Sequence, residues 1–313
     1  MINNNVKGIL RTRRELAANY SAVFIDGKTI RVPIDRTKPI TELRFPEFYD
    51  LSPGNKCSGC CTYCYAGALK NGVHYRNLVS KVDNFFGKMT LEQRPFQVAI
   101  GGEQEPLENP EFWDMCARLR ELGIVPNYTT NGMFVNDRNI ELTKQYSGGV
   151  AVTLHPHLEK FWRRALDRFA EADVKLNVHF IISDAASIDA CEKLYNEYVE
   201  TGMVDYFVLL PWMNYGHAVN EPRHIDFDHF KRWLDKIYAQ GKVAFGANFY
   251  NFIVKHAEQF QVSLYPPEIM SKYLVMDDRM QVSNNSFEKH PVPFTHETGC
   301  EPGHARTVFM AAA

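Results

Sequence analysis

The chain has 313 residues, of which 45% are hydrophobic and 23% charged, the composition of an ordinary globular protein with one large domain or two modest ones. Its formal net charge is −2, so the charge balance gives no sign of a general nucleic-acid binder. No apolar stretch reaches the roughly 20 residues of a membrane span, and the N-terminus lacks the apolar core of a signal peptide, so we expect a cytoplasmic location.

An N-terminal hairpin is the first element that the sequence predicts. Residues 20–34, YSAVFIDGKTIRVPI, contain two strand-like runs on either side of an Asp-Gly pair, which favours a tight hairpin turn. We assign residues 1–47 to an N-terminal extension that carries this hairpin. It would cap the following domain or, as an edge that adds a strand from a bound peptide, dock a substrate.

Short apolar runs and amphipathic stretches alternate after this extension. The runs that predict buried strands are FQVAI, IVPNYTT, GVAVTLH, VKLNVHFII, DYFVLLPW and KVAFGANF, and helical patterns separate most of them. This alternation predicts a parallel sheet with right-handed crossovers. The chain has neither a dinucleotide-binding glycine motif nor a P-loop. We therefore expect an α/β fold with a full or partial (β/α) barrel, whose chemistry lies at the carboxyl ends of the strands. We assign residues 48–264 to a partial (β/α)6-type TIM barrel and residues 265–313 to a C-terminal cap or tail.

The stretch NKCSGCCTYCYAGA places four of the seven cysteines within eight residues. Thiolates bind zinc and iron–sulfur clusters. A structural zinc site normally draws its ligand pairs from separated segments, and a redox-active pair would leave two cysteines unexplained. A third interpretation uses Cys57, Cys61 and Cys64 and leaves Cys60 spare. A non-catalytic zinc or iron–sulfur protein remains the alternative.

With Tyr63 before its last cysteine, the spacing of this loop resembles the C-x-x-x-C-x-aromatic-C motif of the radical SAM superfamily. The segment GGEQEP, residues 101–106, follows the next predicted strand and is similar to the Gly-Gly-Glu motif of that superfamily. The resemblance covers about residues 48–215. It implies that Cys57, Cys61 and Cys64 hold three irons of a [4Fe–4S] cluster, and that the open fourth iron chelates S-adenosylmethionine (SAM).

The resemblance also implies a set of SAM contacts near the strand ends. Glycines would allow close approach of the backbone, and the Glu103 carboxylate would help to receive the SAM ammonium group. The cofactor-binding residues expected in this way are Tyr63, Gly101, Gly102, Glu103, Thr130, Asn131, Thr153, His155, Asn177 and His179.

Some of these strand ends also have a structural explanation. Thr130 and Asn131 would equally suit an Asn-Gly turn with hydroxyl caps. Asn177 and His179 share one face of a strand, and polar groups there must be hydrogen-bonded inside; a lumen that holds a polar cofactor explains them better than a satisfied core pair. Candidate substrate contacts, which loop packing would also explain, are Trp212, Tyr215 and His217.

The function implied by the resemblance is reductive cleavage of SAM, followed by abstraction of a hydrogen atom from a substrate. We expect a small-molecule, nucleoside or nucleobase substrate, because the tail carries only Cys300 where many peptide-modifying relatives have cysteines for auxiliary clusters. A peptide-modifying enzyme is the alternative. Cys300 is then an exposed tail thiol or a neighbour of the active site. A flavodoxin- or ferredoxin-type protein would donate the electron, and the sequence assigns no catalytic acid or base.

Substitution of single cysteines distinguishes a three-ligand from a four-ligand site. After anaerobic reconstitution with iron and sulfide, we expect Cys57→Ala, Cys61→Ala and Cys64→Ala each to lose bound iron, because each removes a ligand. Cys60→Ala should retain about four irons per chain, the content of a complete [4Fe–4S] cluster. Metal analysis of the four variants measures this. A loss of iron in Cys60→Ala that matches the other three would contradict the three-ligand site.

Overall fold

The computed structural model describes residues 8, 10–199, 201–221, 223–237, 241–255, 269–284 and 292–293. Its strands are β1 (Leu10–Glu15), β2 (Tyr20–Ile25), β3 (Lys28–Pro33), β4 (Phe48–Ser52), β5 (Gln97–Ile100), β6 (Val125–Thr130), β7 (Gly149–Thr153), β8 (Leu176–Ile182), β9 (Tyr206–Pro211), β10 (Val243–Phe245), β11 (Ser271–Val275), β12 (Gln281–Ser283) and β13 (Val292–Pro293). Its α-helices are α1 (Leu78–Val82), α2 (Phe112–Glu121), α3 (Asp137–Tyr146), α4 (Glu159–Glu171), α5 (Ala185–Val199), α6 (Phe227–Ile237) and α7 (Tyr250–Lys255).

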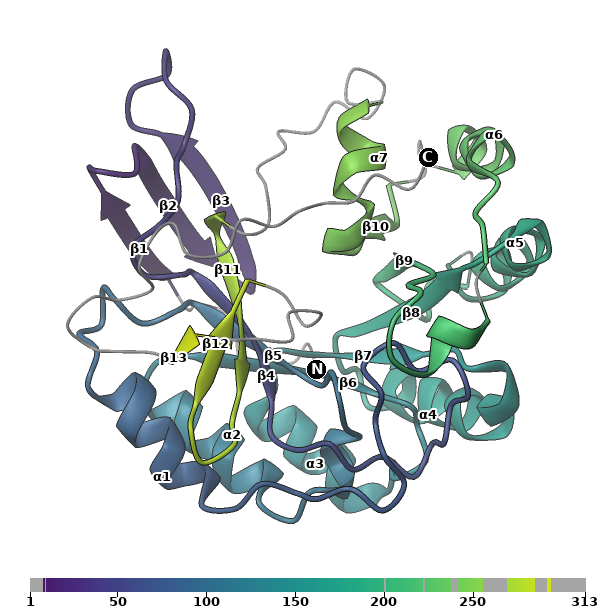
Figure 1. Cartoon of the computed structure of the whole chain (residues 1–313), viewed down its shortest axis with the longest axis horizontal. Coiled ribbons are helices and arrows are strands. Elements are labelled where there is room, and N and C mark those ends of the chain that lie inside the picture. The colour runs from purple at the N-terminus through teal and green to yellow at the C-terminus, as the bar shows by residue number, and fades with distance from the viewer. Residues whose placement is uncertain are drawn as a thin grey trace.

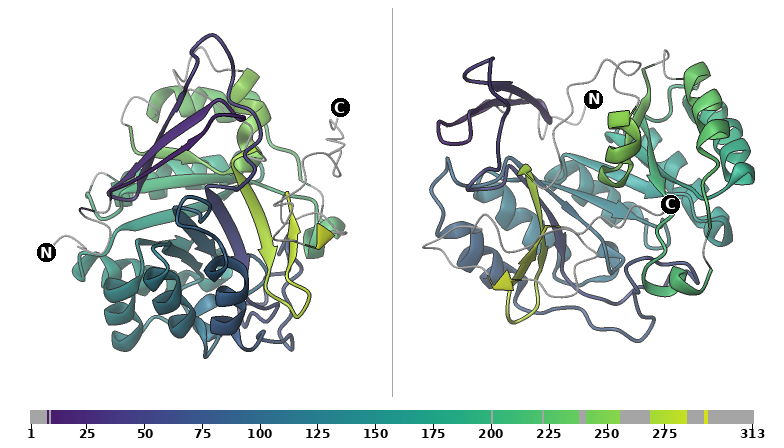
Figure 2. Two further views of the ribbon diagram at one scale, coloured as in Figure 1. Left: turned by 90° about the vertical axis from the view of Figure 1, so that its left-hand side faces the viewer. Right: turned by 45° about the horizontal axis from the view of Figure 1, so that its top comes forward.

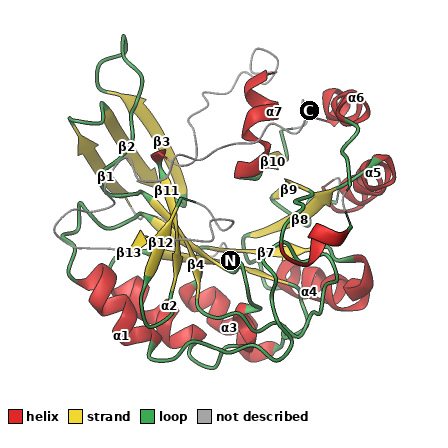
Figure 3. Cartoon of the chain, viewed as in Figure 1, coloured by secondary structure: helices red, strands yellow, loops and turns green. Residues whose placement is uncertain are grey.

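A curved, mainly parallel sheet forms the centre of the molecule. Its strand order is β10-β9-β8-β7-β6-β5-β4-β11-β12-β13, and β4 to β10 follow one another in space as they do in sequence. Helices α1 to α6 cover the convex side of this sheet (Figures 1 and 3). Among the described strands β10 and β13 do not pair with each other, so the barrel is open. The α/β partial barrel predicted from the sequence is confirmed.

The alternation of side chains along the strands separates the two faces of the sheet. In β8, every second residue from Leu176 to Ile182 is buried under the helices, and the residues between them are only half-buried on the concave face. The same alternation in β5 buries Val98 and Ile100. The large core therefore lies between the convex face and the helices, and the polar side chains of the strands collect on the concave face.

The apolar residues of the amphipathic helices form their buried faces. On α2, Phe112, Met115, Cys116 and Leu119 are at most 1% exposed, so Cys116 serves as a small hydrophobic residue in the core. Cys191 of α5 is buried in the same way. Gly123 ends the α2 turn with a φ of 76°, a left-handed conformation in which a side chain would be strained.

A small antiparallel sheet of β1, β2 and β3 packs against the amino ends of the main strands. Asp26 and Gly27 join β2 to β3 with φ values of 49° and 78°, as the predicted tight hairpin turn requires. Phe24 of β2 stacks on Phe96 with ring centroids 5.4 Å apart, and both join Val125 of β6 in a second apolar core. The small sheet (Figure 2) thus lies at the end of the barrel opposite the strand carboxyl ends.

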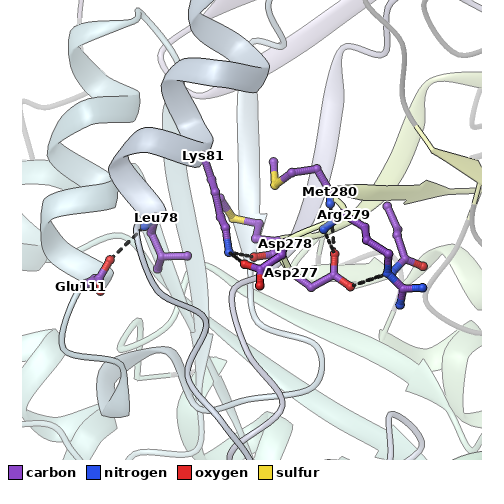
Figure 4. Close-up of polar contacts among 9 residues, drawn as sticks. Leu78, Lys81, Glu111, Asp277, Asp278, Arg279 and Met280 are labelled. Atoms are coloured by element: carbon purple, nitrogen blue, oxygen red, sulfur yellow. Dashed lines mark hydrogen bonds and ion pairs between the residues drawn. The ribbon is translucent and has the colours of Figure 1, made fainter.

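Part of the segment assigned to the C-terminal cap belongs to the main sheet. β11 pairs in parallel with β4, and β12 continues antiparallel beside it. Lys81 of α1 donates to the Met276 carbonyl at 3.0 Å and to Asp278 Oδ1 at 3.1 Å, which anchors the turn between β11 and β12 (Figure 4). Cys300 lies outside the described residues.

A membrane-spanning helix is absent from the part of the chain that the structure describes.

The small sheet is expected to depend on the Phe24–Phe96 contact. Phe24→Ala should lower the free energy of unfolding by about 3–5 kcal/mol, because it removes a fully buried ring and leaves a cavity. Urea unfolding followed by circular dichroism measures this. Ile25→Ala is the matched control, since Ile25 is 39% exposed on the opposite face of the same strand, and its cost should stay below about 1 kcal/mol. Equal costs for both variants would contradict the packing described.

Candidate functional site

The cysteine loop follows β4 directly and is folded back on itself. Isolated bridges join Gly54 to His74 and Lys56 to Leu69. The Cys57 amide donates to the Leu69 carbonyl at 3.0 Å, and the Leu69 amide donates to the Asn55 carbonyl at 2.8 Å. The return segment therefore fixes the backbone at the first cysteine, although the loop contains no regular secondary structure.

Residues that follow four different strands hold this loop over the carboxyl edge of the sheet. After β5, Glu108 accepts hydrogen bonds from the Ser58 amide at 3.0 Å and the Ser58 hydroxyl at 2.9 Å. After β7, His157 Nε2 lies 2.9 Å from the Gly59 carbonyl oxygen. After β9, the His217 amide donates to the Cys64 carbonyl at 2.9 Å.

The fourth contact, from the end of β6, reaches a cysteine side chain. Asn131 Nδ2 lies 3.7 Å from Cys57 Sγ. Glu105 holds this strand end in place, because its carboxylate accepts from the Asn131 amide and the Thr130 hydroxyl, each at 2.8 Å. Glu105 is 2% exposed, and burial raises the pKa of its carboxyl group to about 7.

Glu105 was missed by the sequence analysis, which selected Glu103 in the same motif. The role of Glu105 depends on residues that lie 25 and 26 positions further along the chain. The only signal in the sequence is its place before Pro106, at the start of a short helical turn that its side chain caps through the Leu107 amide.

The four cysteines of the loop differ in exposure. Cys57, Cys61 and Cys64 are half-buried, whereas Cys60 is exposed and has a φ of 50°. Burial raises the pKa of Cys57 to about 11 and that of Cys61 to about 12, and neighbouring thiols add to both shifts. In the described ranges, no three His, Cys, Asp or Glu side chains are grouped closely enough to hold a metal ion.

The donor set nevertheless has the chemistry that an iron–sulfur cluster needs. Soft thiolate ligands select such clusters, and three half-buried thiols with one exposed neighbour match three ligands and a spare. Because burial favours the protonated thiols, binding of a metal must release protons and bring the sulfur atoms into coordination.

Aromatic rings surround Tyr63 beside the cysteines. The Tyr63 hydroxyl lies 3.1 Å from His155 Nδ1. The Tyr63 ring lies with its centroid 5.5 Å from that of Trp212 and 5.9 Å from that of His157. Burial, with smaller contributions from His157 and His179, lowers the pKa of His155 to about 4, so His155 is a neutral donor or acceptor at physiological pH.

The Gly-Gly-Glu segment lies at the carboxyl end of β5, as predicted. A Cβ atom on Gly102 would come within 2.9 Å of the Tyr273 hydroxyl, and the φ of Gly102 is 73°, so only glycine suits this position. Gly101 is less crowded, since its nearest neighbour would be Thr129 at 3.6 Å. Glu103 is half-buried, and burial and then the nearby Asp277 raise the pKa of its carboxyl group.

The remaining predicted contacts divide into two groups. Thr153 of β7 pairs with His179 of β8 on the concave face. Asn177 lies one step along the same face, and its buried Oδ1 has no hydrogen-bond partner among the described residues. The Thr130 hydroxyl instead binds Glu105 and accepts from the Gly132 amide, as in the alternative turn interpretation.

The three candidate substrate contacts beyond β9 also serve the loop in part. Trp212 packs on Tyr63, and His217 binds the loop through its amide and its ring, which lies 3.0 Å from the Ala68 carbonyl oxygen. Tyr215 is 46% exposed. Loop packing therefore accounts for Trp212 and His217.

Comparison with known proteins identifies the fold. No family model matches the sequence, and no curated protein does. SuiB from Streptococcus suis, bound to S-adenosylmethionine, matches with a TM-score of 0.67 and 11% identity, over 90% of this chain and 82% of that one. SuiB bound to precursor peptide SuiA matches with a TM-score of 0.62 and 13% identity, over 80% of this chain and 63% of that one. anSMEcpe with bound AdoMet matches with a TM-score of 0.56 and 15% identity, over 78% and 75%.

These structural neighbours are radical SAM enzymes. At such identities the likeness establishes a common fold, namely the partial barrel.

His179, on the concave face of the sheet, predicts a loss of stability in acid. Burial lowers the pKa of His179 from 6.5 to about 4. Between pH 6.5 and pH 4 this histidine is therefore protonated in the unfolded chain but mostly neutral in the folded chain. Stability therefore falls as the pH falls through this window. Relative to that of His179→Asn, the free energy of unfolding of the wild type should fall by up to about 3 kcal/mol between pH 7 and pH 4. Urea unfolding at both pH values measures it, and parallel pH profiles would contradict it.

Proposed function

We propose that this protein is a radical SAM enzyme. Cys57, Cys61 and Cys64 would hold a [4Fe–4S] cluster with one open iron, and SAM would bind there. The observation that carries the proposal is the loop itself: three half-buried thiols lie over the carboxyl edge of a partial barrel while Cys60 is exposed. Structures of the same fold with bound SAM support it.

When bound, the cluster would supply the electron that breaks the C5′–S bond of SAM and generates the 5′-deoxyadenosyl radical. The residues of this chain would position the reactants and exclude water. Asn131 would donate to Cys57, and the rings of Tyr63 and Trp212 would shield one side of the loop. Thr153 and His179, side by side on the concave face, would contact SAM together with Gly102 and Glu103.

The substrate class has two candidates. The sequence favours a small molecule, nucleoside or nucleobase, because the only cysteine in the tail is Cys300. A peptide substrate is favoured by the neighbours, since SuiB was solved with precursor peptide SuiA and anSMEcpe with the Cp18Cys peptide, at TM-scores of 0.62 and 0.55. In either case the proposed reaction is abstraction of a hydrogen atom, with a flavodoxin- or ferredoxin-type electron donor in the cytoplasm.

The proposal predicts formation of 5′-deoxyadenosine. After anaerobic reconstitution, the chain incubated with dithionite and SAM should release 5′-deoxyadenosine, detected by mass spectrometry. Cys61→Ala should abolish this release, and Cys60→Ala, the matched control on the next residue, should retain it. Wild-type protein that binds zinc in place of iron, or that carries a complete cluster and cleaves no SAM, would overturn the proposed function.

A further inference from the structure

One carboxylate on the concave face remains unexplained by the cysteine loop. Asp50 lies on β4, the strand that runs into the loop, and its side chain shares the face of Ser52. In the sheet register Asp50 pairs with Tyr273 of β11 on one side and with Ala99 of β5 on the other. Ala99 pairs in turn with Asn127 of β6. Asp50 therefore sits in a row across the concave face, between the small sheet and the cysteine loop.

Asp50 differs from the structural carboxylates of the chain. Glu47 accepts hydrogen bonds from Tyr20 and Arg31, and Glu105 accepts them from Thr130 and Asn131. Among the described residues, Asp50 has neither a hydrogen bond nor an ion pair. Water reaches its side chain, yet protein surrounds the carboxyl group closely enough to raise its pKa to about 7. A cation beside such a carboxylate would favour its charged form.

The opposite end of the same row carries the other charge. Gly149 of β7 pairs with Asn127, and a Cβ atom on Gly149 would lie 3.6 Å from the Lys175 Cβ, which places both on one face. Burial lowers the pKa of Lys175, against the opposing effect of Asp205, and no ion pair joins Lys175 to another described residue. The row thus runs from a negative end at Asp50 to a positive end at Lys175, with Ala99, Asn127 and Gly149 between them.

We propose that Asp50 determines substrate specificity by binding a cationic group, an ammonium, of the substrate. This inference rests on the proposed function and names a property of its substrate. A carboxylate only accepts hydrogen bonds, and an ammonium donates up to three of them while neutralising the charge. Lys175 lies four strands away in the row, too far for its charge to act strongly on a cation at Asp50.

The test uses two probes of equal length that differ in charge, n-hexylammonium and 1-hexanol. Isothermal titration calorimetry of the reconstituted, SAM-bound chain should show tighter binding of n-hexylammonium. Asp50→Asn, which keeps the shape of the side chain, should weaken that binding at least tenfold and leave 1-hexanol unchanged. Asp278→Asn, at a fully exposed carboxylate, is the control for general charge and should bind as the wild type does. Lys175→Met, a change four strands away in the same row, should bind n-hexylammonium as the wild type does.

Two outcomes would overturn the inference: n-hexylammonium binding that survives in Asp50→Asn, or 1-hexanol binding as tight as that of the cation. Thermal unfolding of Asp50→Asn excludes loss of folding as the cause of a weaker affinity. Because binding is measured without turnover, the two hypotheses fail separately. Wild-type cleavage of SAM with no effect of Asp50 would refute only the cation site, whereas binding that depends on Asp50 without SAM cleavage would refute only the proposed function.

Discussion

The geometry of the candidate site depends on one constraint: the cysteine loop has no regular structure of its own and must be held by the ends of several strands. A parallel sheet meets this constraint because all its carboxyl ends lie along one edge. Glu108, Asn131, His157 and His217 come from the ends of four different strands, and each binds the loop between Cys57 and Cys64. The strands bring these groups to one place, although up to 159 residues separate Ser58 from His217 in the sequence.

The polar groups of the chain fall into two kinds. Most buried ones are satisfied inside the protein: Glu105 fixes the end of β6, and Glu47 joins β2 and β3 to the domain. On the concave face the buried Asn177 carbonyl oxygen has no partner among the described residues, and the more accessible Asp50 and Lys175 form no ion pair with them. Since unsatisfied polar groups cost free energy, their collection on one face is typical of a surface that a polar ligand completes. The satisfied polar residues hold the site together, whereas the unsatisfied ones are left for a ligand to bind.

Local pattern was enough to predict the repetitive part of the fold. Apolar runs located β5 to β10, and apolar spacing identified the buried faces of α2 and α5. β1 escaped prediction because the sequence LRTRRE looks like a solvated charged segment; its buried residue is Arg13, which donates to the Pro46 carbonyl. β11 escaped because its partner β4 lies more than 200 residues earlier. Within the site, the cysteine spacing was visible in the sequence, but the roles of Glu105 and Asp50 arise from contacts and register that no local pattern encodes.

The central claim is that the three-cysteine loop holds a cluster with an iron open to SAM. Electron paramagnetic resonance of the dithionite-reduced, reconstituted chain tests it most directly, with spectra recorded before and after addition of SAM. We predict the signal of a reduced [4Fe–4S] cluster that changes its g-values when SAM binds, because the ligand alters the coordination of one iron. A cluster signal identical with and without saturating SAM, or the absence of any cluster signal, would contradict the account.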